Sequence, residues 1–295
     1  MNRYINCIAH NSSDGQLLMG SQYTAIFDCG MMFCAGETIS NVKKALKGRT
    51  LDFLFLTHTH YDHVGALPLF RKEWSNLKVI TSETGKGILL KDTPRRVIRE
   101  LSLTAAKIYN VDLKFDYSDD LFHADITVAD NEIISLGGLS VQTLFTPGHT
   151  RDSLSFYVPE IKLLILNETP GILMPDGSAY PCYLTSYNDM VKSIEKCSQL
   201  PFEHLSISHR GVIDSKIAGS FLEKALAAGR TCRDFILDMK NKNYSEEEML
   251  NGYFNKYATE TLLKYQPKEA FLANARATIS GTLKDFFGHS GTCLP

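Results

Sequence analysis

Three histidines and an aspartate follow a strongly apolar run within a few residues of one another. The run LDFLFLT covers 51–57, and the overlapping segment THTHYDHVG places His58, His60, Asp62 and His63 directly after it. A nearly unbroken apolar run of this length is typical of a strand buried on both faces. Imidazole and carboxylate groups at this density are ligands for Zn²⁺, iron or manganese. The segment therefore predicts a metal site at the carboxyl end of a strand in a layered α/β fold.

The spacing within this segment separates the ligands into two groups. His58 and His60 are two residues apart, so on an extended chain they face the same side and can hold one ion. Asp62 and His63 lie beyond the strand end, where the chain can turn and present them to a second ion. Taken by itself, the segment also has an alternative reading as a solvated histidine-rich loop.

Three further strand ends carry a histidine or a carboxylate. TPGHT places His149 after the strand pattern at 139–145, LLILNE ends with Glu168, and HLSISHRG carries His209. A single histidine of this kind more often packs in a core than binds a metal. Four strands that deliver such groups to one edge instead favour a site for two divalent ions. We expect Zn²⁺ first, with Fe or Mn as alternatives.

The order of these motifs resembles the metallo-beta-lactamase superfamily. HxHxDH, TPGHT, an acidic residue after an apolar strand and a strand-end histidine follow one another between residues 16 and 214. The resemblance implies an α/β fold, an αββα sandwich with the metals at one edge. It also implies one ligand set of His58, His60 and His149, a second set of Asp62, His63 and His209, and Glu168 as the bridging ligand.

Two positions beside these ligands bear on the resemblance. Asp28 and Gly30 in IFDCG resemble the family's strand-end Asp-x-Gly, which supports the site without ligating the metal. The family usually has Gly-Asp where this chain has Asn167 and Glu168. Glu168 bridges two ions only if its extra methylene folds back or the strand moves. In the alternative reading, Asn167 occupies the space and Glu168 points elsewhere.

The predicted secondary structure changes from mixed strands and helices to helices alone after Gly211. Residues 215–295 contain little strand signal and several amphipathic helical stretches, one of which opens with Ser245 and three glutamates. We therefore expect a metallo-beta-lactamase-like αββα domain over 1–214 and a helical cap over the metal cleft at 215–295. Through THTHYDHVGALPLF, SISHRG and the weaker pattern PKEAFLANAR, the chain is similar to the bacterial quinolone-signal response thioesterases, whose helices roof the metal cleft.

The resemblance implies a metal-dependent hydrolase whose metal-bridging hydroxide cleaves a small ester, thioester or phosphoester. Asp62 is the candidate catalytic residue, because it ligates and orients the nucleophile and can shuttle its proton to the leaving group. An apolar roof favours an acyl or aryl substrate, and Tyr180, Tyr183 and Asn274 are candidates to line it. The alternative is a regulatory or effector protein that keeps the metals but acts through a partner-binding surface.

The composition of the chain limits its possible partners and cellular compartment. The chain has 31 Lys and Arg against 33 Asp and Glu, so it has no overall basic field for a nucleic-acid backbone. Its seven cysteines are odd in number and never form CxxC, which favours reduced thiols over a disulfide framework. No window approaches the roughly 20 apolar residues that a membrane-spanning helix needs. We expect a cytoplasmic protein with a small-molecule substrate and no nucleic-acid or membrane partner, and homo-oligomerisation stays open.

Overall fold

The structure is a computed structural model that describes residues 4–10 and 14–288, and its backbone contacts divide them into two units. The first unit consists of the described residues up to Phe145 together with Asp152–Asn167 and Phe202–Ile213. The second unit consists of Thr146–Arg151, Glu168–Pro201 and the described residues from Asp214 onward. Two segments from the middle of the chain therefore belong with the C-terminal helices. The division into a domain at 1–214 and a cap at 215–295 stays a prediction.

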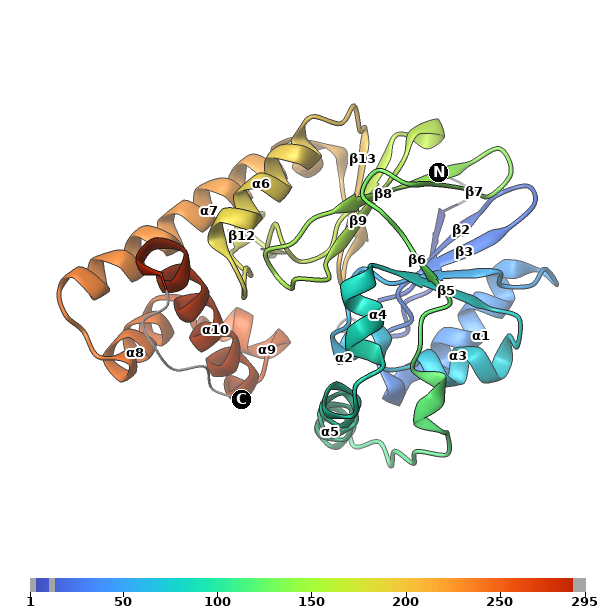
Figure 1. Cartoon of the computed structure of the whole chain (residues 1–295), viewed down its shortest axis with the longest axis horizontal. Helices are drawn as coiled ribbons and strands as arrows, with labels where there is room; N and C mark the ends of the chain where they lie inside the picture. Colours follow the sequence, from blue (N-terminus) through green and yellow to red (C-terminus); the bar gives the residue numbers. More distant parts are fainter. Residues whose placement is uncertain (1–3, 11–13, 289–295) are drawn as a thin grey trace. The chain divides into compact units, whose positions relative to one another are not determined.

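Two six-stranded sheets make up the centre of the first unit (Figure 1). The first sheet runs in the order β1 (Tyr4–Asn6), β2 (Gln16–Met19), β3 (Thr24–Phe27), β4 (Phe53–Phe55), β5 (Lys78–Thr81) and β6 (Ile126–Thr127). The second runs in the order β14 (Gly211–Val212), β13 (His204–Ile207), β10 (Leu163–Ile165), β9 (Leu154–Val158), β8 (Ser140–Phe145) and β7 (Ile133–Ser135). Strand β4 pairs in parallel with β3 and β5. The strand before the histidine motif therefore lies inside its sheet, as the apolar run predicted.

The two sheets pack face to face around three phenylalanine rings. Phe27 of β3, Phe55 of β4 and Phe156 of β9 are buried, and their ring centroids lie 5.1 to 5.3 Å apart. Leu54 belongs to a different cluster, which includes side chains of the helices, because successive side chains of a strand point to opposite faces. Each of these buried side chains stabilises the fold by roughly 1.5–3 kcal/mol. Both faces of β4 are thus covered.

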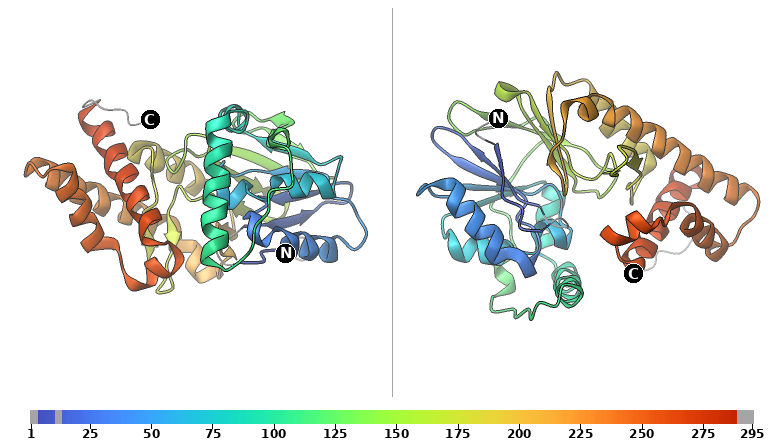
Figure 2. Two further views of the ribbon diagram at one scale, coloured as in Figure 1. Left: turned by 90° about the horizontal axis from the view of Figure 1, so that it is seen from below. Right: turned by 180° about the vertical axis from the view of Figure 1, so that it is seen from behind.

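Helices cover the outer face of the first sheet (Figure 2). They are α1 (Ala35–Leu46), α2 (Tyr61–Val64), α3 (Leu67–Glu73), α4 (Glu83–Leu89) and α5 (Asp92–Ile108), and the unit also has 3₁₀ turns at Met32–Cys34, Asp119–Leu121 and Pro159–Ile161. Helix α4 ends at Leu89, and α5 begins at Asp92. Pro94 lies in the first turn of α5, where backbone N–H groups have no partner within the helix, so proline is tolerated.

Helices dominate the second unit, as predicted for the C-terminal region. The hairpin strands β11 (Ile172–Leu173) and β12 (Ala179–Tyr180) precede α6 (Tyr187–Ser198), α7 (Ser215–Asn241), α8 (Glu246–Tyr257), α9 (Glu260–Tyr265) and α10 (Lys268–Phe287). Ser245 and Glu248 cap the start of α8 reciprocally, each side chain accepting the other residue's N–H. Helix α10 packs against α6, α7 and α8. No helix of the described chain is long and apolar enough to cross a membrane.

Candidate metal centre

The first unit carries His58 and His60 where the chain leaves β4 and enters α2. His60 is the N-cap residue of α2, and its extended backbone places it just before the helix. The His58 and His60 ring centroids are 4.6 Å apart, and one possible ligand atom of each lies within 4.8 Å of the other. His58 is buried, and its Nδ1 lies 3.0 Å from the hydroxyl oxygen of Thr57. The predicted pair therefore lies together.

A second group of donors lies beside this pair in the same unit. The Oδ2 atom of Asp62 is 3.8 Å from Nε2 of His63 and 3.7 Å from Nε2 of His209. The ring of His63 lies 4.1 Å from that of His58, measured between centroids. The structure thus brings together the three side chains that the resemblance assigns to one ion, and places the group next to His58.

Asp28 supports this group in the manner expected of the strand-end Asp-x-Gly. Its Oδ2 lies 2.9 Å from Nδ1 of His63, and the carboxylate also accepts hydrogen bonds from the N–H and hydroxyl of Thr57. A carboxylate at Nδ1 favours the tautomer in which that nitrogen carries the proton and Nε2 carries the lone pair. Asp28 therefore leaves the lone pair of His63 on Nε2, the nitrogen that lies beside Asp62.

Asp14 also belongs to this group, although no motif in the sequence pointed to it. A carboxylate oxygen of Asp14 and ring nitrogens of His63 and His209 lie within 4.8 Å of one another. Asp14 Oδ2 also accepts a hydrogen bond of 2.9 Å from the backbone N–H of His209, whose φ of +62° is unusual for a residue other than glycine. Burial raises the pKa of the Asp14 carboxyl, against the opposing effect of the two histidines. No motif marks this aspartate, which lies 195 residues from His209.

The second unit carries the other two predicted ligands, His149 and Glu168. Nε2 of His149 lies 2.9 Å from Oε2 of Glu168, and its Nδ1 lies 2.6 Å from the backbone oxygen of Cys182. Burial by itself lowers the pKa of His149, but Cys182 and the Glu168 carboxylate outweigh it and hold that pKa well above its ordinary value. His149 and Glu168 therefore form a buried imidazole and carboxylate pair.

The turn before His149 can only be built with glycine. Gly148 has a φ of +140°, and a Cβ atom there would lie 2.7 Å from Cγ2 of Thr169 and 2.8 Å from Cα of Met190. The hydroxyl of Thr169 accepts the N–H of His149 and donates to the carbonyl oxygen of Thr146. These contacts set the direction in which His149 leaves the backbone.

A family model of the metallo-beta-lactamase superfamily matches residues 17–209. The chain belongs to this superfamily. It is 25% identical over 217 residues to a metallo-beta-lactamase fold-containing protein of Sulfurisphaera tokodaii, covering 72% of this chain and 77% of that one. A probable metallo-hydrolase of Bacillus subtilis is 27% identical over 68% of this chain and 85% of its own length. A hydroxyacylglutathione hydrolase of Bartonella tribocorum is 30% identical over 56% of this chain and 51% of its own length.

A solved structure supports the same fold. An archaeal superfamily protein from Sulfolobus tokodaii superposes with a TM-score of 0.55 at 23% identity, covering 72% of this chain and 80% of that one. The predicted fold class is confirmed as a mixed α/β metallo-beta-lactamase fold with two six-stranded sheets and a helical C-terminal region. The narrower similarity to quinolone-signal response thioesterases stays a prediction.

The metallo-beta-lactamase fold implies divalent metal binding, and the donors in each unit fit such an ion. Imidazole nitrogens and carboxylate oxygens are the ligands that Zn²⁺, Fe and Mn share. Glu168 and Asp14 are carboxylates exposed by only 7% and 3%, and a buried carboxylate needs a cation or hydrogen bonds to offset its lost hydration. The chain is thus a metallo-beta-lactamase superfamily hydrolase with candidate metal ligands in both units.

Proposed function

We propose that this chain is a metal-dependent hydrolase that uses two divalent ions to cleave a small ester, thioester or phosphoester. In this proposal one ion takes the first ligand set, the other takes the second set, and Glu168 bridges them. The grouping of Asp62 Oδ2 with Nε2 of His63 and His209 carries the proposal, since two imidazoles and a carboxylate form a metal-binding set. Zn²⁺ is the ion we propose first, with Fe or Mn as alternatives.

The residues around the ions have separate tasks in this proposal. When bound, two such ions lower the pKa of a coordinated water to about 7 and polarise the oxygen of the scissile group. Asp62 orients the attacking water, accepts its proton on a carboxylate oxygen and passes the proton to the leaving group. Asp28 takes no part in proton transfer, because His63 and Thr57 already occupy its carboxylate.

The contacts of Glu168 and its neighbour favour Glu168 as the bridging ligand. The amide nitrogen of Asn167 donates to the carbonyl oxygen of Leu154 at 3.0 Å and lies 3.3 Å from the Ser155 hydroxyl. The Glu168 carboxylate instead lies against Nε2 of His149. The alternative reading, with Asn167 as the metal neighbour, has to break the bond between this amide and the strand β9.

We propose a thioester as the first substrate class. The Bartonella tribocorum relative is named a hydroxyacylglutathione hydrolase, and several further relatives carry the same name. A hydroxyacylglutathione is an acyl thioester of a small thiol peptide. The chain spans only 51% of the Bartonella tribocorum relative. We therefore leave the acyl and thiol parts of this chain's substrate to the experiment below.

Elemental analysis and a substrate panel test this proposal together. We expect two ions per chain after saturation with Zn²⁺, Mn²⁺ or Fe²⁺, and turnover of at least one compound in a panel of thioesters, esters and phosphodiesters. Replacing His60 by Ala should abolish turnover and keep the fold, because it removes a ligand on the rim rather than core packing. His123→Gln is the matched control, since His123 is a half-buried histidine outside the motif. One ion or none, or wild-type turnover in the His60 variant, overturns the assignment.

The same panel separates the hydrolase from a regulatory or effector protein that acts through a partner-binding surface. Glu168, in place of the family's usual aspartate, is the feature that favours the second reading, because a displaced bridge weakens the second ion. A chain that holds both ions but cleaves nothing across the panel supports the effector. Turnover that depends on His60 supports the enzyme.

The thiols support the cytoplasm as the proposed compartment. Cys7, Cys29, Cys34, Cys182, Cys197 and Cys232 are buried, and Cys293 lies outside the described residues. Burial raises the pKa of the Cys29 thiol well above its ordinary value and that of Cys7 to about 11, so these thiols stay protonated and unreactive. Buried, protonated thiols such as those of Cys7 and Cys29 suit a reducing compartment.

A further inference from the structure

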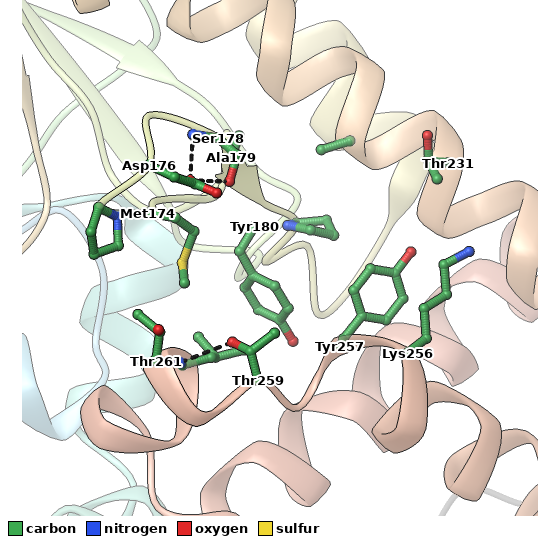
Figure 3. Close-up of a pocket in the computed structure, with 14 residues that line it drawn as sticks. Met174, Asp176, Ser178, Ala179, Tyr180, Thr231, Lys256, Tyr257, Thr259 and Thr261 are labelled. Carbon is green, nitrogen blue, oxygen red and sulfur yellow. Dashed lines mark hydrogen bonds between the residues drawn. The ribbon is translucent and has the colours of Figure 1, made fainter.

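A cavity of about 440 Å³ lies entirely within the second unit (Figure 3). Its walls come from the β11–β12 hairpin, from the middle of α7 and from the residues around the α8–α9 junction. Small-molecule sites usually have volumes of roughly 300–1,000 Å³. None of the 14 residues that line the cavity is a candidate metal ligand. The cavity is therefore large enough for a small molecule that the metal centre does not account for.

One wall of the cavity is aromatic. The rings of Tyr180 and Tyr257 lie 6.1 Å apart between centroids in an edge-to-face arrangement. Figure 3 shows both rings facing the same space, with Met174 on the other side of Tyr180. Pro175, Pro181, Ala228 and Leu262 add apolar surface. Aromatic rings attract a further ring in stacked or edge-to-face geometry, and a flexible thioether adapts to its outline.

Hydroxyl and thiol groups behind this wall hold it in place. The hydroxyl oxygen of Tyr180 lies 3.5 Å from that of Tyr253, and the Cys232 thiol lies 3.8 Å from the same Tyr253 hydroxyl. Tyr253 and Cys232 are completely buried. Burial raises the pKa of the Tyr180 and Tyr253 hydroxyls, so these two groups stay uncharged through the neutral range. Because the wall is already ordered, a ligand binds without first having to organise it.

Lys256 is one of the residues that line the cavity, and its ammonium has no carboxylate partner among the described residues. Its Nζ lies 4.0 Å from the centre of the Phe235 ring and 5.6 Å from that of Tyr257, and it takes part in no ion pair within the described chain. The acidic residue at the rim, Asp176, accepts the N–H and the hydroxyl of Ser178 at 2.9 and 2.6 Å. These hydrogen bonds lower the pKa of Asp176 and hold its carboxylate in its own turn, where it stays negatively charged, and Lys256 is the cation among the residues that line the cavity.

We propose that this cavity binds a planar aromatic molecule that carries a single carboxylate. The ring packs against Tyr180 and Tyr257, and the carboxylate lies toward Lys256. Thr231 and Thr259, which also line the cavity, offer hydroxyl groups to polar substituents on the ring. This site uses no metal ligand and does not depend on the proposed hydrolase function.

Calorimetric titration of the full chain with 1-naphthoate and with its neutral isostere 1-naphthamide tests the proposal. We expect one naphthoate per chain, bound more tightly than naphthamide. Lys256→Gln should weaken the binding of naphthoate by roughly 2- to 5-fold, because an exposed ion pair contributes little, and should leave the affinity for naphthamide unchanged. Lys268→Gln is the matched control, because Lys268 also packs on a ring, that of Phe254, but does not line the cavity.

Filling the cavity tests its location. Ala228→Leu should weaken both ligands by at least 10-fold, whereas Ala227→Leu, one position along α7 and exposed, should change neither. Helical circular dichroism and thermal unfolding confirm that both variants fold. Naphthoate should also bind unchanged to the His60→Ala variant, which separates this site from the metal centre. No binding to the wild-type chain at millimolar ligand, full binding to Ala228→Leu, or binding that is lost with His60 overturns the proposal.

Discussion

The Nδ1 atom of His63 lies 2.9 Å from Oδ2 of Asp28, and both side chains are buried. The hydroxyl of Thr57 donates to the same Oδ2 at 2.7 Å and lies 3.0 Å from Nδ1 of His58. One carboxylate therefore orients two predicted ligands, His63 directly and His58 through Thr57. Asp28 adopts a left-handed backbone conformation with a φ of +57°, which is strained for a residue other than glycine. Strained backbone of this kind is concentrated at functional sites.

Replacing Asp28 by Asn should lower metal affinity by roughly 10- to 100-fold, because the amide holds the Nδ1–H tautomer of His63 less well. Chelator competition measures the affinity, and elemental analysis gives the occupancy. Asp52→Asn is the control, since Asp52 likewise accepts a backbone N–H and a hydroxyl, both from Thr24, at a strand start away from the histidines. Equal metal affinity in the two variants contradicts the orienting role.

Glu168→Gln keeps the size of the side chain but removes the charge that would offset the two cations of the proposed centre. We expect metal occupancy to fall from two ions toward one. Glu168→Asp restores the usual residue and should keep both ions, because the carboxylate is retained. Metal titration of both variants measures the outcome. Two tightly held ions in Glu168→Gln rule out the bridging role.

Gly148→Ala should destabilise the chain by about 1–3 kcal/mol and weaken metal binding through His149. The added Cβ meets the backbone of Met190 at 2.8 Å, where little can move. Gly219→Ala on α7 is the contrasting control, because nothing lies within 4 Å of its Cβ, and it should stabilise the chain by roughly 0.5–1 kcal/mol. Urea denaturation curves compare the two, and a neutral Gly148 variant counts against the tight turn.

The stability of the first unit should fall in acid partly through Asp125. Although burial acts in the opposite direction, hydrogen bonds from Val79 N–H and Arg71 hold the pKa of Asp125 below its ordinary value. A lowered folded-state pKa means that this stabilisation is complete above the unfolded pKa, near pH 4, and is lost as the pH falls through the folded one. Asp125→Asn should therefore flatten the decline in stability below about pH 4. Asp116→Asn, at a fully exposed carboxylate, should leave that decline as it is.

The local pattern of the sequence was sufficient for the strands, the helical tail and the donors of the histidine motif. The run at 51–57 predicted β4, because a strand covered on both faces has to be apolar at successive positions. Ser245 followed by three glutamates predicted the start of α8, because the signals that begin a helix lie within its first turn, and the structure shows a capping box between Ser245 and Glu248. The superfamily match over 17–209 confirms the fold that the motif order implied. The ligand roles of the seven site residues stay predictions.

Tertiary structure alone decided which distant residues complete each site. Asp14 contacts His209 across 195 residues, and no periodicity or motif connects them. Tyr180 and Tyr183 were both candidates to line a roof over the metals, and that role stays a prediction. In the structure Tyr180 lines the cavity of the second unit, whereas Tyr183 is buried and accepts a hydrogen bond from Thr282 of α10. The segments Thr146–Arg151 and Glu168–Pro201 associate with the C-terminal helices by the same kind of long-range packing. Burial and capping patterns in a sequence depend on interactions between residues that are close along the chain. A cavity or a ligand set depends instead on how separate elements pack together.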